Sequence, residues 1–398
     1  MSGGRRVAVT GLGVVAPAGI GASNYWDGLI GPPAPVGRTI VFDDWDGSPY
    51  FEGPKQARRA DRVEQFALAA AGEAFDQVGG VDAVAVDPGR FGTIFATGIG
   101  GLHTLEEQIG VHNEKGPRRV SPFLVPMMMA NAPGASISMR YGLQGQSETI
   151  VTACAAGSHA INYAARLIKW GILDAAVTGG CESAGTPTGI AGFANMTALS
   201  SAGVSRPFDV DRDGFVMGEG GAVLILEEWS VAEARGAKIL GEILGGASNA
   251  DAHHITAPAP GGVGAIKCIE LALAESGLAA ADVKQVNAHG TSTPLNDAAE
   301  AAAITQVFGA QAVPVTSTKG ITGHALGAAG ALEAVAALLS IQNEAIPPTA
   351  NTVNVDPELD IDLVFGAPRA WEPGPVVSTN FGFGGHNGVV VVAPASAG

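Results

Sequence analysis

The sequence predicts a layered α/β fold. Short runs rich in Val, Ile and Ala alternate with longer stretches in which apolar residues recur at helical spacing. Several of the short runs are almost continuously apolar, as expected for strands that are buried on both faces of a sheet. Hydrophobic residues make up 46% of the 398 residues and charged residues only 15%, which suits a large core. Such alternation of strands and helices favours a sheet covered by helices through right-handed crossovers.

The strands and helices can be placed along the chain from these patterns. The predicted strands are residues 6–14, 91–97, 147–153, 173–178, 222–227, 283–288, 313–317, 376–380 and 388–393. The predicted helices are residues 60–78, 155–170, 264–276, 297–308 and 326–341. Each half of the chain carries a strand that ends at a turn rich in reactive or ligand-binding residue types, IVTACAAG in the first and VVSTNFGFGG in the second, so the sequence predicts two similarly built halves, residues 1–245 and 246–398.

Charge and cysteine content restrict the function classes. The formal net charge is −16, and nucleic acid binding depends on clustered Lys and Arg, so nucleic acid is not an expected partner. Three cysteines without C-x-x-C spacing do not form a disulfide framework and indicate a reducing compartment, the cytoplasm. The first apolar run is interrupted by two glycines and a proline, which favours a strand and turn over a cleaved signal. No apolar run reaches the roughly 18 residues of a membrane span, so no membrane association is expected.

Cys154 is the first candidate catalytic residue. It stands between a predicted strand and a predicted amphipathic helix, where the helix dipole is positive. That position can lower the thiol pKa from about 8.5 toward neutrality and produce a nucleophilic thiolate. Small residues at 155–158 leave room for a substrate carbonyl to reach backbone N–H groups. The alternative, a buried structural cysteine, is our interpretation of Cys181 and Cys268.

Two histidines occupy Gly-containing turns at the ends of predicted strands. His289 follows residues 283–288, and His324 follows residues 313–317, with Lys319 five positions before it. Loops at strand ends are common positions for catalytic side chains. A cysteine with two histidines serves either nucleophilic catalysis or zinc binding, and the nearby lysine and the absence of short ligand spacing disfavour zinc. The remaining loop histidines are predicted to be solvated or capping residues: His103, His112, His159, His253 and His254.

The segment NFGFGGHNG is close to a glycine-rich phosphate loop, but a strand-like run follows it instead of a helix. A dinucleotide site requires the helix N-terminus, so that interpretation is rejected. Gly382, Gly384 and Gly385 are instead expected to allow a close approach of the backbone to a ligand.

Five segments together resemble the elongating type II β-ketoacyl-[acyl carrier protein] synthases of the thiolase superfamily. They are TACAAGSHAIN, NAHGTSTPLND, STKGITGHALGAAGALE, NFGFGGHNG and RPFDVDRDGFVMGEGGAVLILEE, and the resemblance covers essentially the whole chain. It implies a thiolase-like five-layered αβαβα fold made of two duplicated halves. The first half carries the nucleophilic cysteine and the second half the two catalytic histidines.

The resemblance implies a decarboxylative Claisen condensation in fatty-acid elongation. Cys154 accepts the growing acyl chain, and the backbone N–H groups of Cys154 and Phe383 form an oxyanion hole. His289 and His324 stabilise the enolate formed from a malonyl carrier, and the product is a 3-oxoacyl carrier. The second histidine favours elongation, because initiating relatives have an asparagine there. Further residues matching family positions are Lys319 and Glu333 as a buried ordering pair, Thr291 and Thr293 as contacts of the pantetheine arm, Phe383 as a gate, and Ile99 as a wall of the acyl tunnel.

The resemblance also implies the partners. The substrate arrives on the phosphopantetheine arm of an acidic acyl carrier protein, and no tightly bound cofactor or metal is expected. The residues that match the docking positions are Lys55, Arg58, Arg59, Arg118 and Arg119. Thr197 stands where the family often has an arginine, residues 200–204 form a shorter loop, and His386 replaces a common threonine. These departures keep open a type II polyketide or polyene pathway, in which the partner is a chain-length-factor homologue, beside the homodimer of fatty-acid elongation.

Overall fold

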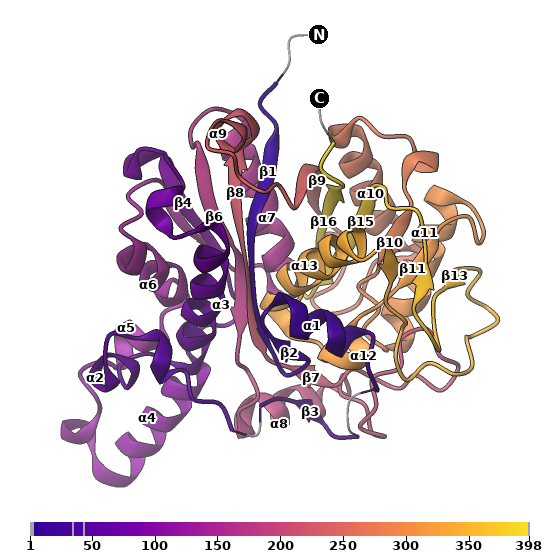
Figure 1. Ribbon diagram of the computed structural model, residues 1–398. Coiled ribbons are helices and arrows are strands. Elements are labelled where there is room, and N and C mark those ends of the chain that lie inside the picture. Colours follow the sequence, from indigo (N-terminus) through magenta and orange to yellow (C-terminus); the bar gives the residue numbers. More distant parts are fainter. Residues whose placement is uncertain (1–3, 34–35, 43, 397–398) are drawn as a thin grey trace.

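The computed structural model describes residues 4–33, 36–42 and 44–396, and most of its strands form one long twisted sheet (Figure 1). The strand order is β13-β11-β10-β15-β16-β9-β1-β8-β6-β4-β5, and β2 pairs with β1. The strands are β1 (Val7–Ala16), β2 (Gly19–Ile20), β4 (Phe91–Ala96), β5 (Ser147–Ile150), β6 (Ala175–Glu182), β8 (Gly220–Glu228), β9 (Gly241–Ala250), β10 (Gln285–Asn287), β11 (Pro314–Thr316), β13 (Asp362–Leu363), β15 (Val376–Gly382) and β16 (His386–Ala393). Two small sheets pair β12 (Ala345–Ile346) with β14 (Arg369–Ala370), and β3 (Thr39–Ile40) with β7 (Met217–Gly218).

The long sheet consists of two halves with the same topology. They meet where β1 pairs with β9 through only two residue pairs, Ala8 with Glu242 and Val9 with Gly241. In the first half, β8 lies antiparallel between β1 and β6, and β4 and β5 continue in parallel. In the second half, β16 lies antiparallel between β9 and β15, and β10 and β11 continue in parallel. The predicted α/β class is therefore confirmed, and the strands correspond one to one in chain order.

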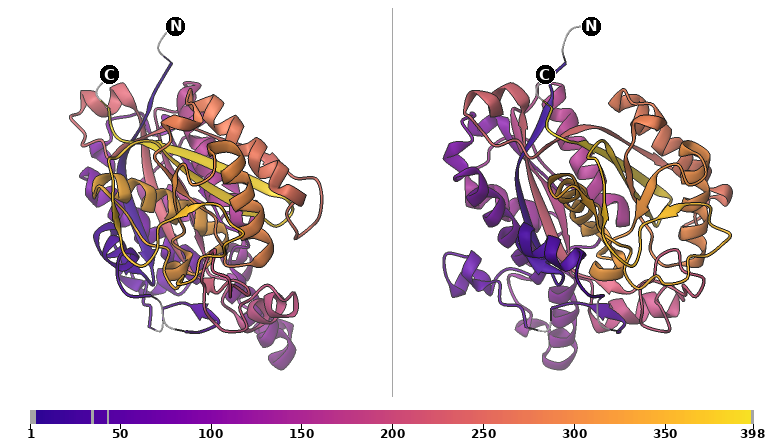
Figure 2. Two further views of the ribbon diagram at one scale, coloured as in Figure 1. Left: turned by 90° about the vertical axis from the view of Figure 1, so that its right-hand side faces the viewer. Right: turned by 45° about the vertical axis from the view of Figure 1, so that its right-hand side comes forward.

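The fold has five layers: the two halves of the sheet, one layer of helices between them, and one layer of helices on each outer face (Figures 1 and 2). In the first half, α3 (Arg62–Val78) and α6 (Ala132–Tyr141) pack on the outer face, and α10 (Val263–Ser276) and α11 (Pro294–Phe308) do so in the second half. The middle layer is α7 (Ala156–Lys169) and α13 (Ala329–Gln342), which both contact strands of both halves. The other helices are α1 (Ala22–Leu29), α2 (Pro54–Ala57), α4 (Leu102–Lys115), α5 (Leu124–Met128), α8 (Pro187–Asn195), α9 (Trp229–Ala234) and α12 (Lys319–Thr322). Within the described part of the chain, no helix combines the length and the hydropathy that crossing a bilayer requires.

All nine predicted strands and five predicted helices occur, with ends shifted by a few residues. The strand β9 was not predicted, because its glycines give it a low strand propensity. Those glycines are required by close packing: a Cβ at Gly246 would lie 1.9 Å from Oδ1 of Asn162, and one at Gly245 would lie 3.1 Å from the backbone N of Ser276. The boundary at residue 245 stays a prediction and falls inside β9, so we propose that the second half begins with this strand.

The turns IVTACAAG and VVSTNFGFGG, which suggested the duplication, do not occupy equivalent positions in the two halves. By topology, the strand before the Cys154 turn, β5, corresponds to β11, whereas β15 corresponds to β6. The equivalent turns also share their backbone: Ala153 has φ 51° three residues before α7 begins, and Leu326 has φ 43° three residues before α13 begins. The turn that presents Cys154 is thus repeated before α13, at the other side of the middle layer.

Candidate active site

Cys154 lies in a strained turn at the start of α7. The strand β5 ends at Ile150, three residues before its predicted end, because Ala153 adopts a left-handed backbone conformation. Strain of this kind in a residue other than glycine is often found at functional sites. A Cβ at Gly382 would lie 3.0 Å from the backbone N of Cys154, so a glycine is needed for β15 to pass this turn. At Gly382 the close approach is to the backbone of the turn that holds the candidate nucleophile, and the predicted approach of these glycines to a ligand stays a prediction.

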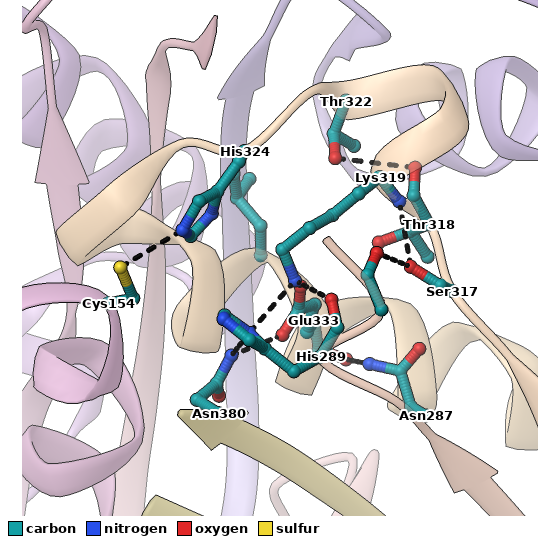
Figure 3. A network of polar contacts seen from close by, with 12 residues as sticks. Cys154, Asn287, His289, Ser317, Thr318, Lys319, Thr322, His324, Glu333 and Asn380 are labelled. Atoms are coloured by element: carbon teal, nitrogen blue, oxygen red, sulfur yellow. Dashed lines mark hydrogen bonds and ion pairs between the residues drawn. The ribbon is translucent and has the colours of Figure 1, made fainter. Parts of the chain in front are cut away.

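The structure brings Cys154, His289 and His324 together from three distant segments (Figure 3). The Nε2 atom of His324 lies 3.0 Å from the Sγ atom of Cys154. The two imidazole rings are nearly perpendicular, with centroids 5.1 Å apart. All three side chains are buried, yet they line one cavity of about 630 Å³. A thiol and two imidazoles thus face the same cavity.

The hydrogen bonds of His289 assign its tautomer. The Nζ atom of Lys319 and the Nδ2 atom of Asn380 each lie 3.3 Å from Nδ1 of His289. Ammonium and amide nitrogens are donors, so Nδ1 accepts and the proton of the neutral ring is on Nε2. Burial holds the pKa of His289 well below its ordinary value, and the nearby Lys319 and His324 lower it further. The neutral ring therefore offers Nε2–H as a hydrogen-bond donor.

Lys319 and Glu333 form a buried ion pair beside His289. Lys319 also donates to the backbone oxygen of His289 over 2.5 Å. Burial raises the pKa of Glu333, and the charge and hydrogen bond of Lys319 oppose that rise. Removing either partner would leave an unpaired charge in the interior, which is costly. The pair has the geometry expected of residues that order the site.

Burial raises the pKa of the Cys154 thiol to about 12. The backbone N–H groups of Phe383 and Cys154 and the charge of Lys319 lower it, but by less than desolvation raises it. The expected shift toward neutrality is therefore not seen, because the thiol is only 6% exposed. Burial also holds the pKa of His324 well below its ordinary value. A protonated thiol thus faces a neutral imidazole, whose Nε2 can accept the thiol proton.

The cavity also receives the predicted substrate-binding residues, with one exception. Thr291, Thr293 and Phe383 line it, and the hydroxyls of Thr291 and Thr293 lie 3.0 Å apart. Thr293 in addition caps α11 through the backbone N–H of Asn296. Ile99 is not among the lining residues and is 42% exposed. In this single chain, Ile99 therefore lies at the surface, and its assignment to a tunnel wall stays a prediction.

The five basic residues predicted for docking are exposed. The guanidinium of Arg59 lies over the ring of Phe123 at 4.0 Å from its centroid. That contact places the segment of Lys55, Arg58 and Arg59 beside the segment that contains Arg118 and Arg119. Their role in docking stays a prediction.

Sequence reasoning missed several polar residues that support the site. Glu300 accepts hydrogen bonds of 2.7 Å from the backbone N–H groups of both His289 and Gly290, and it thereby holds this turn. Asn380 stands in the motif that was interpreted only through its glycines and Phe383. His159 was expected to be solvated or capping, but its ring nitrogens lie 2.9 Å from Oγ1 of Thr152 and 2.9 Å from the backbone oxygen of Asn387. The available signal for Glu300 was its position in a run of alanines, whereas Asn380 and His159 have polar neighbours in the sequence and were not marked in this way.

The zinc alternative does not fit these donors. The Sγ atom and one nitrogen of each imidazole lie within 4.8 Å of one another, which is close enough to consider a metal. A metal would need the lone pair of Nε2 of His289, where the two donors at Nδ1 have placed a proton. The cation of Lys319 would also repel it. The arrangement favours nucleophilic catalysis over metal binding.

Comparison with known proteins agrees with this geometry. Residues 38–232 match the family model described as β-ketoacyl synthase, N-terminal domain, and residues 240–353 match its C-terminal domain. The chain is 46% identical over 406 residues to the 3-oxoacyl-[acyl-carrier-protein] synthase 2 of Synechocystis sp., covering 96% of both chains. A solved structure described as the ishigamide ketosynthase/chain length factor superposes with a TM-score of 0.93 at 31% identity and covers 99% of this chain and 100% of that chain. Another, described as a type II PKS acyl-carrier protein in complex with its ketosynthase bound to the hexaketide, gives a TM-score of 0.89 at 30% identity, over 99% of this chain and 100% of that one. From the paired matches over both halves, the chain belongs to the β-ketoacyl synthase family.

Proposed function

We propose that this chain elongates acyl chains in fatty-acid synthesis by decarboxylative condensation with a malonyl thioester. Family membership makes it a condensing acyltransferase. The observation that carries the proposal is the contact of 3.0 Å between the Cys154 thiol and His324, with His289 beside them in one cavity.

The first step is acyl transfer to the enzyme. The Sγ atom of Cys154 attacks the carbonyl carbon of an acyl thioester, and its proton passes to Nε2 of His324. Backbone N–H groups of Cys154 and Phe383, which lower the pKa of the thiol, stabilise the oxyanion. When the carbon–sulfur bond of the substrate breaks, the leaving thiolate takes the proton from His324. The product is an acyl-Cys154 thioester and a free carrier thiol.

The second step generates the carbon nucleophile. The malonyl thioester loses its carboxylate as CO₂, and the electron pair moves onto the thioester oxygen as an enolate. The Nε2–H of His289 donates a hydrogen bond to that oxygen, and His324 adds a second once its ring has exchanged the Nδ1 proton for one on Nε2 with solvent. Charge appears on the oxygen only as the carbon–carbon bond breaks, so these donors act on the transition state.

The third step forms the product. The enolate carbon attacks the acyl-Cys154 carbonyl, the new carbon–carbon bond forms, and the carbon–sulfur bond to Cys154 breaks. The thiolate of Cys154 is released and takes one proton from solvent, which replaces the thiol proton that left with the first carrier, and a 3-oxoacyl thioester leaves. The cycle is ping-pong, since the first carrier departs before the second one enters.

A phosphopantetheine arm of an acyl carrier protein is the proposed delivery device. Thr291 and Thr293 supply hydroxyls along the cavity wall, and the exposed Lys55, Arg58 and Arg59 offer positive charge to an acidic carrier. The similar ketosynthase described above is itself in complex with an acyl-carrier protein. We propose the cytoplasm as its location, and three free, buried cysteines support a reducing compartment.

A dimer, of two identical chains or with a chain-length-factor homologue, is the proposed assembly. The strand β5 ends the sheet, and its residues Ser147 and Glu148 are exposed. Apolar side chains are exposed on the neighbouring elements: Val125 on α5 at 55%, Met139 on α6 at 77% and Val151 after β5 at 47%. An unpaired sheet edge flanked by apolar side chains favours association with another chain.

A type II polyketide pathway is the second candidate. One observation favours it: the solved ketosynthase/chain length factor described above covers 99% of this chain with a TM-score of 0.93. Co-purification of this chain with a homologue that lacks the nucleophilic cysteine would support that pathway, and a homodimer that makes fatty acyl chains unaided would support elongation.

Mass spectrometry of the intact protein tests the function. After incubation with acyl carriers of several chain lengths, we expect one acyl adduct on Cys154, followed by its loss and a 3-oxoacyl product when malonyl carrier is added. Cys154→Ala should abolish the adduct, whereas Cys268→Ala, at a buried cysteine outside the cavity, should retain it. An adduct that persists in Cys154→Ala, or a wild-type protein that never forms one, would contradict the proposal.

A further inference from the structure

Asn380 occupies a junction between the nucleophile and the His289 side of the site (Figure 3). It lies near the end of β15 and is 0% exposed. Its Nδ2 atom donates to Oε2 of Glu333 over 2.6 Å and lies 3.3 Å from Nδ1 of His289. Its Oδ1 atom accepts a hydrogen bond from the hydroxyl of Ser158, one helical turn after Cys154. A single amide thus connects the helix of the nucleophile, the buried ion pair and the candidate catalytic imidazole.

The direction of the Asn380 amide has a chemical consequence at His289. The Oδ1 atom of Asn380 accepts from the Ser158 hydroxyl, and the Nδ2 atom of Asn380 donates to Oε2 of Glu333. Both hydrogen bonds form only when the NH₂ group of the amide faces the ring of His289. A donor at Nδ1 excludes a proton there and leaves it on Nε2. The reversed amide would present an acceptor to Nδ1 and favour the opposite tautomer, in which Nε2 carries a lone pair toward the cavity. That lone pair would repel an enolate oxygen instead of stabilising it.

Lys319 does not perform this task by itself. Its Nζ also donates to the backbone oxygen of His289 and to Oε1 of Glu333, so its contact with Nδ1 is one of three. Asn380 binds the other oxygen of Glu333, and it therefore also keeps this carboxylate in line with the lysine. Lys319 and Asn380 thus both donate to Glu333, and this shared acceptor keeps both donors beside Nδ1 of His289.

We propose that Asn380 is a positioning residue for malonyl decarboxylation, and that the Ser158–Asn380–Glu333 chain holds His289 in the tautomer with its proton on Nε2. This inference rests on the proposed function for its kinetic consequence, but the tautomer itself can be observed without any substrate. Acyl transfer to Cys154 uses His324 and the backbone N–H groups, so Asn380 acts mainly on the second half of the cycle.

The test reverses the polarity of the side chain with the isosteric substitution Asn380→Asp. In either protonation state, the new carboxyl group offers an acceptor to Nδ1. In ¹⁵N-histidine-labelled protein, we expect wild-type His289 to show a protonated Nε2 and a bare Nδ1, and Asn380→Asp to show substantial protonation of Nδ1. A His289→Asn sample identifies the signal.

Kinetics of the separate half-reactions provide the second readout. Release of CO₂ from malonyl carrier should fall about 100-fold in Asn380→Asp, as for the loss of one well-placed donor, while acyl loading of Cys154 should stay within about 3-fold of wild type. Ser158→Ala is a milder variant that removes the hydroxyl orienting the amide. It should slow decarboxylation about 10-fold, the effect of one neutral hydrogen bond.

Asn343→Asp is the matched control, since it makes the same chemical change at an exposed position just after α13. It should leave the tautomer and both half-reactions unchanged. The inference is overturned if folded Asn380→Asp keeps both the wild-type tautomer and the wild-type rate of decarboxylation. It is equally overturned if both half-reactions fall in parallel with the tautomer unchanged, since that describes a structural defect. A wild-type chain that shows the expected tautomer but neither loads nor decarboxylates would reject the proposed function alone.

Discussion

At Cys154, the cost of burying a charge and the attraction of nearby donors act in opposite directions on the thiol. Burial is the larger effect and raises the pKa to about 12, although Phe383, Lys319 and the residue's own N–H favour the thiolate. The thiol therefore stays protonated until a substrate carbonyl is near and His324 takes the proton. The reactivity of the nucleophile is a property of the assembled site and not of a free thiolate.

The pH dependence of alkylation follows from this pKa. Because the thiolate fraction of Cys154 is small at neutral pH, its reaction with iodoacetamide should keep accelerating as the pH rises from 7 to 10, without a plateau near 8.5. Single-site alkylation rates measured by mass spectrometry check this expectation. The same raised pKa affects the free energy of unfolding. Below the pKa of the unfolded thiol both states are protonated and stability is unchanged, and above it stability falls as the pH rises, because only the unfolded state ionises readily. A plateau at or below pH 8.5 would contradict the dominance of burial.

Removal of the imidazole of His324 should affect the first half-reaction most directly. In His324→Ala the thiol loses its proton acceptor, so the rate of acyl loading at pH 7 should fall about 10²–10⁴-fold, the usual contribution of general acid–base catalysis. His112→Ala, at an exposed position on α4, serves as the control with unchanged loading. Loading that is unaffected in His324→Ala would exclude this residue as the proton acceptor.

At the scale of single elements, the site depends on how closely α7 and α13 approach each other. A Cβ at Gly157 would lie 2.7 Å from the backbone N of Ala331, and a Cβ at Gly330 would lie 2.5 Å from the backbone N of Ser158. Both glycines are the second residues of their helices, so the duplicated halves use the same device. Their contact brings the start of the nucleophile's helix against the start of the helix that carries Glu333.

Gly330→Ala should therefore destabilise the protein, because the clash is with backbone atoms that cannot rotate away. We expect a loss of about 1–3 kcal/mol in the free energy of unfolding, typical of an overfilled core, measured by urea denaturation. Gly110→Ala, in α4 with open space around the new methyl group, should instead stabilise the protein by about 0.5–1 kcal/mol through helix propensity. Equal effects at the two positions would show that the close approach of the helices is not under steric control.

At the scale of the whole molecule, the two halves share one middle layer. Thirteen of the fourteen residues of α13 are buried, and Glu333 is its one charged residue. Apolar residues lie on every side of this helix, as expected when strands of both halves and α7 surround it. Each half by itself would expose one face of this layer to water.

The separated halves should therefore not fold independently. We expect residues 4–240 expressed alone to lack a cooperative thermal transition and to be degraded rapidly by protease, because the inner face of α7 would be exposed. Co-expression with residues 241–396 should restore a cooperative transition if the halves associate. A fragment that unfolds cooperatively when expressed alone would show that the first half is an autonomous domain.

The sequence by itself determined the local features of this protein. Apolar periodicity placed nine strands and five helices, and the turns after them carried Cys154, His289 and His324, because these features depend on residues close together in the chain. Only the tertiary structure decided the rest: the strand β9, whose glycines are there for a neighbouring helix; the correspondence of β5 with β11; the raised thiol pKa; and the network of Asn380 and Glu300. Each of these depends on burial or on contacts between segments far apart in sequence, and the local pattern of residues contains no record of such distances.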